Sequence, residues 1–178
     1  GTVGYYGNVK GGWMIDGVNR DGLLVGTFYF PENGDYSKND KEDMINLYTK
    51  DVNKYLLENC KSVNDIKKIA NELNIKKISI GIVPFSFHWL AVDKTGKCIV
   101  LEVKNEKLKV YDNPYNVITN SPTFPEHIKS LKKYSNLTKF NRTDKVQGPF
   151  GTGMEGLPGD STSISRFIRA EFFVKNVT

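Results

Sequence analysis

The chain has 178 residues, a formal net charge of +5 at pH 7 and a sequence pI near 9.0. This length fits one domain or two small ones. A content of 39% hydrophobic and 25% charged residues is typical of a chain that folds around a core, which excludes the disordered and low-complexity classes. No run of about 18 apolar residues occurs, so we expect no membrane-spanning helix. Two cysteines are too few for a disulfide framework, which favours a reducing compartment and a cytoplasmic location.

The positive charge comes mainly from lysines that are interleaved with acids. Residues 38–43 and 104–107 show this mixture, with Lys and Asp or Glu close together. Dispersed charge is typical of a solvated surface, whereas a dedicated nucleic-acid binder usually concentrates its charge on one face or strand. We therefore expect no nucleic-acid partner.

Two strands are predicted in the first part of the chain. Residues 13–19 and 22–30 have the composition of strands, and Arg20-Asp21-Gly22 supplies a turn between them. A polar loop is then predicted from Pro31 to Asp40.

Two helices are predicted after this loop. Apolar residues recur at helical spacing from Met44 to about Glu58, which predicts an amphipathic helix. Ser62 is expected to be the N-cap of a second helix, and Asp65 at its third position makes a short-armed capping box.

From Lys76 onward the pattern changes to strands and turns. Four strands are predicted at residues 78–83, 88–93, 98–103 and 108–112. The connections at 94–96 and 104–107 have hairpin length, which favours antiparallel neighbours. Residues 125–135 and 164–174 are expected to be helical. This order of elements predicts an α+β fold in which helices pack on an antiparallel sheet.

A glycine-rich loop is predicted at residues 146–160, and its segment 151–156 has the spacing Gly-x-Gly-x-x-Gly. This spacing superficially matches a dinucleotide fingerprint, but that motif needs a following helix, and here Leu-Pro-Gly follows at 157–159. We therefore reject a dinucleotide site. Two alternatives remain: a shaped surface loop whose glycines supply positive φ, or a loop that frames an active site and leads into a helix at 160–166.

The histidines and cysteines do not form a catalytic group in the sequence. His88 lies in an apolar predicted strand beside Trp89, which favours a hydrogen-bonded histidine in the core. His127 falls in a polar predicted helix, and we expect its side chain to be exposed. Cys60 and Cys98 have no neighbour that indicates a lowered thiol pKa, so we expect small buried side chains. No group of Cys and His has the spacing of zinc ligands.

Two polar residues could carry chemistry. Asn120, within Thr-Asn-Ser-Pro at 119–122, could project a carboxamide from a fixed turn and donate to an oxyanion. The alternative is an Asx-turn or a cap, which the residues alone favour. Arg166 follows a polar stretch at 160–165 and could hold an anionic ligand, lower the pKa of a nucleophile, or form a structural ion pair.

Several short segments, taken in order, resemble one family. They are Asp16-Gly-Val-Asn-Arg-Asp-Gly-Leu23, Phe28-Tyr-Phe-Pro31, His88-Trp-Leu-Ala-Val-Asp-Lys-Thr-Gly96, Val110-Tyr-Asp-Asn-Pro114, Thr119-Asn-Ser-Pro122, Phe150-Gly-Thr-Gly153, Gly156-Leu-Pro-Gly-Asp160 and Ser165-Arg-Phe167. Together they span essentially the whole chain and resemble the choloylglycine hydrolase family, which holds bile salt hydrolases and penicillin V acylases. No single segment is decisive, but the ordered set is highly specific.

The resemblance implies an N-terminal-nucleophile hydrolase with an αββα sandwich. Such enzymes cleave linear amide C–N bonds with an N-terminal cysteine whose α-amino group serves as the base, so the resemblance implies no cofactor and no metal. In this family the oxyanion is held by an Asn carboxamide, at the position of Asn120, and by a backbone N–H, at the position of Tyr29. An Arg beside the nucleophile matches Arg166.

The resemblance also implies that part of the catalytic machinery lies elsewhere. The nucleophilic cysteine is expected before residue 1, and the family continues past Thr178. Residues 1–178 are therefore expected to be a single segment of a choloylglycine hydrolase-like domain, truncated at both ends and inactive alone. Its missing parts should leave apolar surface uncovered. The full-length protein is expected to be a homo-oligomer, a tetramer in the family, that acts on a small amphipathic amide.

The substrate stays open at this point. Bile salt hydrolases usually carry Asn at the position of Tyr29 and penicillin V acylases carry Tyr, whereas residues 110–122 are closer to the hydrolases. As the substrate, conjugated bile salts are slightly favoured, and penicillin V is the alternative. Two other hypotheses are a non-catalytic homologue that binds an amphipathic anion and a basic binding module unrelated to amidases. The last of these requires a concentrated cationic face.

Overall fold

The computed structural model describes residues 1–7, 13–80, 83–141 and 151–177. The chain divides into two compact units, residues 1–114 and 115–178, and each is described by itself. The expectation of a single domain segment truncated at both ends stays a prediction.

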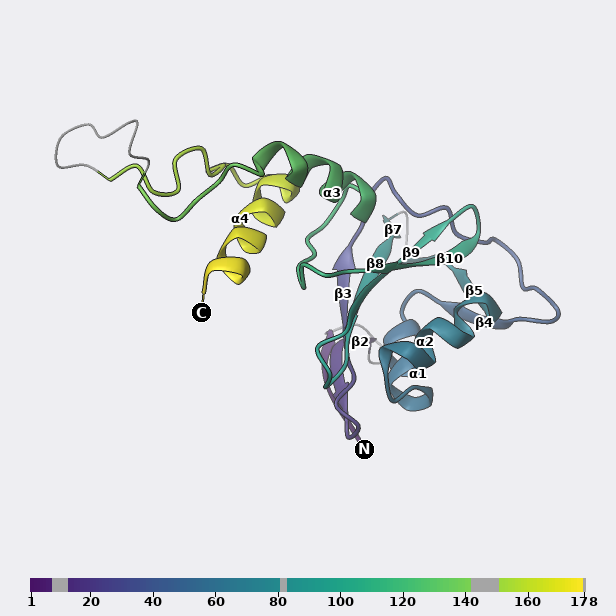
Figure 1. Ribbon diagram of the computed structural model, residues 1–178. Helices are drawn as coiled ribbons and strands as arrows, with labels where there is room; N and C mark the ends of the chain where they lie inside the picture. The colour runs from purple at the N-terminus through teal and green to yellow at the C-terminus, as the bar shows by residue number, and fades with distance from the viewer. Residues whose placement is uncertain (8–12, 81–82, 142–150, 178) are drawn as a thin grey trace. The chain divides into compact units, whose positions relative to one another are not determined.

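The first unit is built on a six-stranded antiparallel sheet (Figure 1). Its strands, in spatial order, are β1 (Thr2–Gly7), β2 (Trp13–Asn19), β3 (Leu24–Tyr29), β8 (Phe87–Val92), β9 (Cys98–Lys104) and β10 (Lys107–Asp112). The predicted antiparallel meander from β8 to β10 is confirmed. Strand β1 was not predicted, and it pairs with β2 at the edge of the sheet.

The turn between β2 and β3 follows the predicted chemistry. The Asn19 side chain accepts hydrogen bonds from the backbone N–H groups of Asp21 and Leu23, at 3.1 and 3.0 Å. Gly22 has φ +85°, in the left-handed region that a residue without Cβ adopts at low cost. The turn therefore fixes the register at which β2 and β3 pair.

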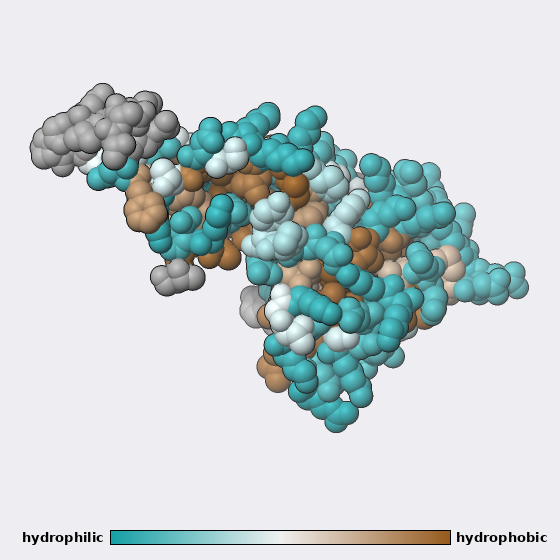
Figure 2. All heavy atoms as spheres, in the orientation of Figure 1, coloured by the Kyte–Doolittle hydropathy of each residue, from teal (hydrophilic) through white to brown (hydrophobic). Residues whose placement is uncertain are grey.

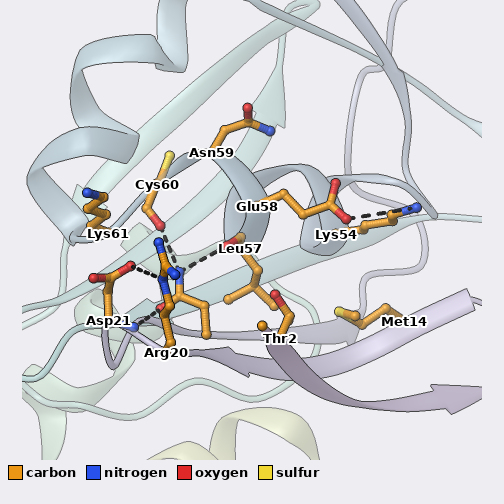
Figure 3. Close-up of a pocket in the computed structure, with 12 residues that line it drawn as sticks. Thr2, Met14, Arg20, Asp21, Lys54, Leu57, Glu58, Asn59, Cys60 and Lys61 are labelled. Atoms are coloured by element: carbon orange, nitrogen blue, oxygen red, sulfur yellow. Dashed lines mark hydrogen bonds and ion pairs between the residues drawn. The ribbon is translucent and has the colours of Figure 1, made fainter.

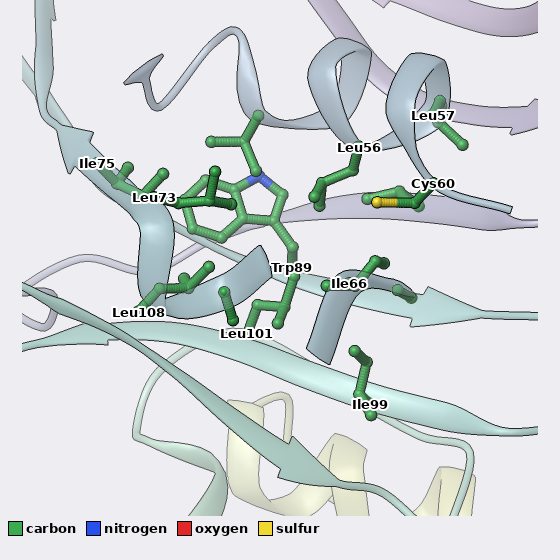
Figure 4. Packing of buried hydrophobic residues seen from close by; sticks show 14 of the residues in the cluster. Leu56, Leu57, Cys60, Ile66, Leu73, Ile75, Trp89, Ile99, Leu101 and Leu108 are labelled. Carbon is green, nitrogen blue, oxygen red and sulfur yellow. The ribbon is translucent and has the colours of Figure 1, made fainter. Parts of the chain in front are cut away.

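Helices α1 (Val52–Asn59) and α2 (Val63–Ile69) pack their apolar side chains against the sheet to form the core of this unit. The predicted cap of α2 is confirmed, because Ser62 accepts a hydrogen bond from the Asp65 backbone N–H. Trp89 lies in the middle of the core, among side chains from both helices and from the strands (Figure 4). Burying each large apolar side chain stabilises the fold by about 1.5–3 kcal/mol. The most buried of them are Leu23, Val25, Val52, Leu56, Ile66, Leu73, Trp89, Ile99 and Leu101.

The predicted helix from Met44 is wrong over residues 44–51, because α1 begins only at Val52. Residues Ile45–Tyr48 form strand β4, which pairs in parallel with β5 (Leu73–Lys76). Ile45 and Leu47 pack against the core from this strand. The apolar residues have helical spacing, but pairing with β5 favours a strand. This tertiary contact cannot be predicted from the local sequence pattern.

The single strand predicted at residues 78–83 is also wrong. The structure has two short antiparallel strands there, β6 (Ile78–Ile80) and β7 (Val83–Phe85). A strand that has a partner on one side only tolerates a proline such as Pro84, whereas a central strand does not.

The second unit contains helices α3 (Phe124–Leu131) and α4 (Ser163–Asn176), close to the predicted bounds. Thr123 and Glu126 form a reciprocal capping box at the start of α3, and the Thr162 side chain accepts from a backbone N–H at the start of α4. Two one-turn 3₁₀ helices complete the described elements, Ala70–Glu72 in the first unit and Lys132–Tyr134 in the second. Within the described residues, no helix is both long and apolar enough to cross a membrane.

Apolar side chains gather over the α3 and α4 region in Figure 2. At and just after the C-terminal end of α4, the side chains of Phe173, Val174 and Val177 are 47%, 52% and 75% exposed. The expectation that missing parts leave apolar surface uncovered stays a prediction.

Candidate active site

The turn that carries Asn120 is held from two sides within the second unit. Thr119 precedes it and donates from Oγ1 to the Ser163 carbonyl oxygen at 2.9 Å, which ties the turn to α4. The Arg166 side chain, also on α4, donates from Nη2 to Oδ1 of Asn120 at 2.8 Å. The structure therefore brings together two of the three predicted site residues.

Thr123, and not Asn120, is the N-cap of α3, while the catalytic role expected of Asn120 stays a prediction. The N-cap of α3 is Thr123, whose backbone N–H and Oγ1 both contact Glu126 Oε2, at 3.1 and 2.6 Å. An Asx-turn needs the N–H of the residue two positions on, and Pro122 has none. Arg166 binds Oδ1, the acceptor end of this amide, and Nδ2 is its donor end.

Arg166 is exposed, and its Nε donates to the Ser161 carbonyl oxygen at 3.2 Å. Among the described residues no carboxylate lies within ion-pair distance of it. Its neighbour Asp160 instead accepts from the backbone N–H of Thr162 and from Ser165 Oγ, at 2.9 and 2.7 Å. The guanidinium charge therefore remains available to an anion, which argues against a structural ion pair.

His127 is fully buried, so the expectation of an exposed side chain is wrong. Its Nε2 lies 2.9 Å from the Asn120 carbonyl oxygen, and its ring stacks on Phe167 at 4.7 Å between centroids. The signal that was missed is the stripe of Phe124, His127, Ile128 and Leu131, which recurs at helical spacing on one face of α3.

Tyr29 is the last residue of β3, in the first unit, where it pairs with Phe87. The next residue, Phe30, donates its N–H to the Ser86 carbonyl oxygen at 2.8 Å. Backbone N–H groups alternate sides along a strand, so the Tyr29 N–H points away from β8 and toward the β2 side. On that side the pairing of β3 with β2 ends at Gly26. The convergence of Tyr29 with Asn120 and Arg166 stays a prediction.

The two cysteines are poor nucleophiles. Burial raises the pKa of Cys60 to about 11 and the pKa of Cys98 to about 12. Thiols that attack carbonyl carbons have lowered pKa values and partial exposure, which neither residue has. Both are buried, as predicted.

His88 is the core histidine that the sequence predicted. It is fully buried, its Nδ1 lies 3.2 Å from Glu102 Oε1, and its ring stacks on Phe30 at 4.2 Å.

The glycine-rich loop is described from residue 151 onward, and its first part lies outside the described residues. Asn141 Oδ1 accepts from the backbone N–H groups of Thr152 and Gly153, at 2.9 and 3.0 Å. A Cβ on Gly153 would lie 2.5 Å from the Lys139 carbonyl oxygen, so only glycine fits there. These contacts shape the loop, and a role in framing an active site stays a prediction.

A cleft of about 480 Å³ lies in the first unit between α1 and the β1–β2 edge (Figure 3). Four of its charged side chains form ion pairs, Arg20 with Asp21 and Lys54 with Glu58, both at 3.9 Å. None of Tyr29, Asn120 and Arg166 lines it. No group of three or more His, Cys, Asp or Glu residues in the described part of the chain could hold a metal ion.

A family model described as linear amide C–N hydrolases, choloylglycine hydrolase family, matches residues 2–178. The chain belongs to the choloylglycine hydrolase family.

The chain spans about half the length of the curated relatives that it matches. A bile salt hydrolase/transferase from Clostridium perfringens is 39% identical over 89% of this chain and 51% of its own. An uncharacterized protein of Paramecium bursaria Chlorella virus 1 is 40% identical over 96% of this chain and 63% of its own. A penicillin V acylase from Pectobacterium atrosepticum is 27% identical over 91% and 41%.

The structure of this chain is also similar to solved structures of the family. A crystal structure of a conjugated bile acid hydrolase variant from Clostridium perfringens superposes with a TM-score of 0.88 and 35% identity, covering 98% of this chain and 58% of the other. The chain is thus an α+β part of the N-terminal-nucleophile hydrolase fold, as the sequence predicted, with one parallel strand pair, β4–β5, beside its antiparallel sheets.

Proposed function

We propose that this chain is part of an enzyme that hydrolyses the linear amide C–N bond of a conjugated bile salt. The observation that carries the proposal is the hydrogen bond from Arg166 Nη2 to Asn120 Oδ1. This bond orients the carboxamide so that its Nδ2 can donate to the oxygen on which negative charge develops.

The chemistry begins with a thiol supplied by an N-terminal cysteine outside this sequence. The α-amino group of that cysteine takes the thiol proton, and the sulfur attacks the amide carbonyl carbon. The tetrahedral oxyanion accepts hydrogen bonds from Asn120 Nδ2 and from the backbone N–H of Tyr29. Collapse of this intermediate expels the amine, which takes up the proton, and water then hydrolyses the thioester. The buried thiols of Cys60 and Cys98, with their raised pKa values, support an attacking group outside this chain.

Arg166 has two roles in this proposal. It holds the Asn120 amide by its oxygen, and its uncompensated charge favours the thiolate form of the nucleophile. Both roles need the guanidinium to be free of a carboxylate, which agrees with its contacts among the described residues.

Penicillin V is the second candidate substrate. Tyr29 matches the residue expected of penicillin V acylases rather than of bile salt hydrolases. The higher identity to the bile salt hydrolase/transferase, 39% against 27%, favours bile salts. We further propose that the full-length protein is a homo-oligomer, as the family resemblance implies.

The test uses the full-length protein with glycocholate, taurocholate and penicillin V, and it measures release of the free acid. Release of free bile acid that is abolished when the N-terminal cysteine is replaced by serine supports the proposal. Release from penicillin V alone would move the assignment to the acylases. Retained bile-salt binding with no release from any substrate would identify a non-catalytic homologue.

A further inference from the structure

Asn120 is attached to α4 through its side chain and to α3 through its backbone. Arg166 of α4 binds its Oδ1, and His127 of α3 binds its carbonyl oxygen. The His127 ring also stacks on Phe167, the residue that follows Arg166, with a 20° angle between ring planes. One buried side chain therefore touches both the Asn120 turn and the helix that carries Arg166.

We propose that His127 is a positioning residue for the Asn120 amide, an inference that rests on the proposed function. Its Nε2–H donates to the Asn120 carbonyl oxygen, and its ring packs on Phe167 to set the distance between the turn and α4. Asn120 Nδ2 is then placed where the oxyanion develops, with no contact between His127 and the substrate.

The burial of His127 makes this contact hard to replace. A carbonyl oxygen only accepts hydrogen bonds, so Nε2 must carry the proton, which fixes the tautomer. The side chain has no exposed surface, so water cannot readily take over the bond when the donor is removed. The Asn120 turn would then shift, and its side chain would shift with it.

The main test replaces His127 in the full-length protein. His127→Phe keeps an aromatic ring against Phe167 and removes the donor, while His127→Gln keeps a donor near the position of Nε2. We expect His127→Phe to lower kcat about 10- to 100-fold, because a displacement of about 1 Å at a catalytic group costs up to about 10²-fold. KM should change little, and His127→Gln should recover most of kcat.

A matched control separates positioning from stability. Thr123→Ala breaks the capping box of α3, which destabilises the same helix without touching the Asn120 carbonyl. This variant should melt earlier and keep its kcat. Equal losses of kcat in His127→Phe and Thr123→Ala, or no recovery in His127→Gln, would overturn the inference. Should His127→Phe fail to fold, His127→Asn serves in its place, because its shorter amide does not reach the carbonyl oxygen.

A double-mutant cycle with Asn120→Ala distinguishes this inference from the proposed function. Asn120→Ala removes the amide and leaves the backbone carbonyl in place. If His127 acts through the amide, His127→Phe should cost little further kcat in the Asn120→Ala background. A large loss from Asn120→Ala with none from His127→Phe would refute the positioning role alone. No loss from Asn120→Ala would refute the oxyanion role on which both rest.

Discussion

His88 and His127 are both fully buried, and each stacks on a phenylalanine, yet their partners differ. His88 lies in the six-stranded sheet and contacts the carboxylate of Glu102 on the neighbouring strand. His127 lies in a helix of the other unit and contacts a backbone carbonyl in the turn that carries a proposed catalytic side chain. Burial alone therefore does not indicate the role of a histidine, whereas the group to which it hydrogen-bonds does.

Loss of each ring should therefore have a different consequence. Removing His88 disturbs a side-chain pair inside the sheet, and removing His127 disturbs the position of Asn120. We expect the first to act on the free energy of unfolding and the second on kcat.

The largest effect is expected for Asn120→Ala in the full-length protein. Losing one oxyanion donor typically costs about 10²–10³ in kcat, or roughly 3–4 kcal/mol. KM should change little, since the ground-state carbonyl needs the donor less than the transition state does. Measured kcat, KM and melting temperature decide the case. A lowered melting temperature with unchanged kcat would leave Asn120 as a structural residue, and the distinction between the two histidines would lose its basis.

Arg166→Gln should have the next largest effect. We expect a loss of about 10- to 100-fold in kcat/KM, because hydrogen bonds to charged groups are worth about 1.5–3 kcal/mol. Removing the positive charge also raises the pKa of the thiol, so the acid limb of the pH profile should move to higher pH. Arg169→Gln is the matched control, because Arg169 lies on the same helix and binds the carbonyl oxygens of Pro158 and Asp160. A limb that shifts equally in both variants would contradict the thiolate role.

His88→Leu should destabilise the protein without changing the chemistry. Glu102 loses a buried hydrogen-bond partner, which should lower the free energy of unfolding by about 1–3 kcal/mol. Urea denaturation measures this loss, and kcat of the folded protein at saturating substrate should stay close to wild type. A tenfold loss of kcat would place His88 in the active site and remove the contrast with His127.

The sequence predicted the sheet better than the regions around it. The strands β8, β9 and β10 alternate with hairpin-length connections, so local pattern alone determines them. Strand β4 was missed because its residues have helical spacing. Its partner, β5, is separated from it in the sequence by helices α1 and α2. No local rule detects a partner at that separation.

The candidate site was predicted in part for the same reason. Asn120 and Arg166 came from short motifs, and their hydrogen bond joins residues 46 positions apart. His127 was misjudged because polar neighbours on α3 hid its position on the apolar stripe. The stacking of His127 on Phe167 depends on how α3 packs on α4, which composition does not reveal.

Asp160 should give the smallest effect, and it tests the electrostatics at the start of α4. Hydrogen bonds from Thr162 and then Ser165 lower the pKa of its carboxyl to about 2. Because the folded-state pKa is lowered, the contribution of Asp160 to stability is present at neutral pH. It is lost as the pH falls from about 4, the ordinary carboxyl pKa, toward about 2. The carboxylate is exposed, so the contribution is small. Melting temperatures of the wild type and of Asp160→Asn should differ at pH 7, and the difference should close through this window. A difference that stays constant down to pH 2 would mean that the charge of Asp160 does not stabilise the helix that presents Arg166.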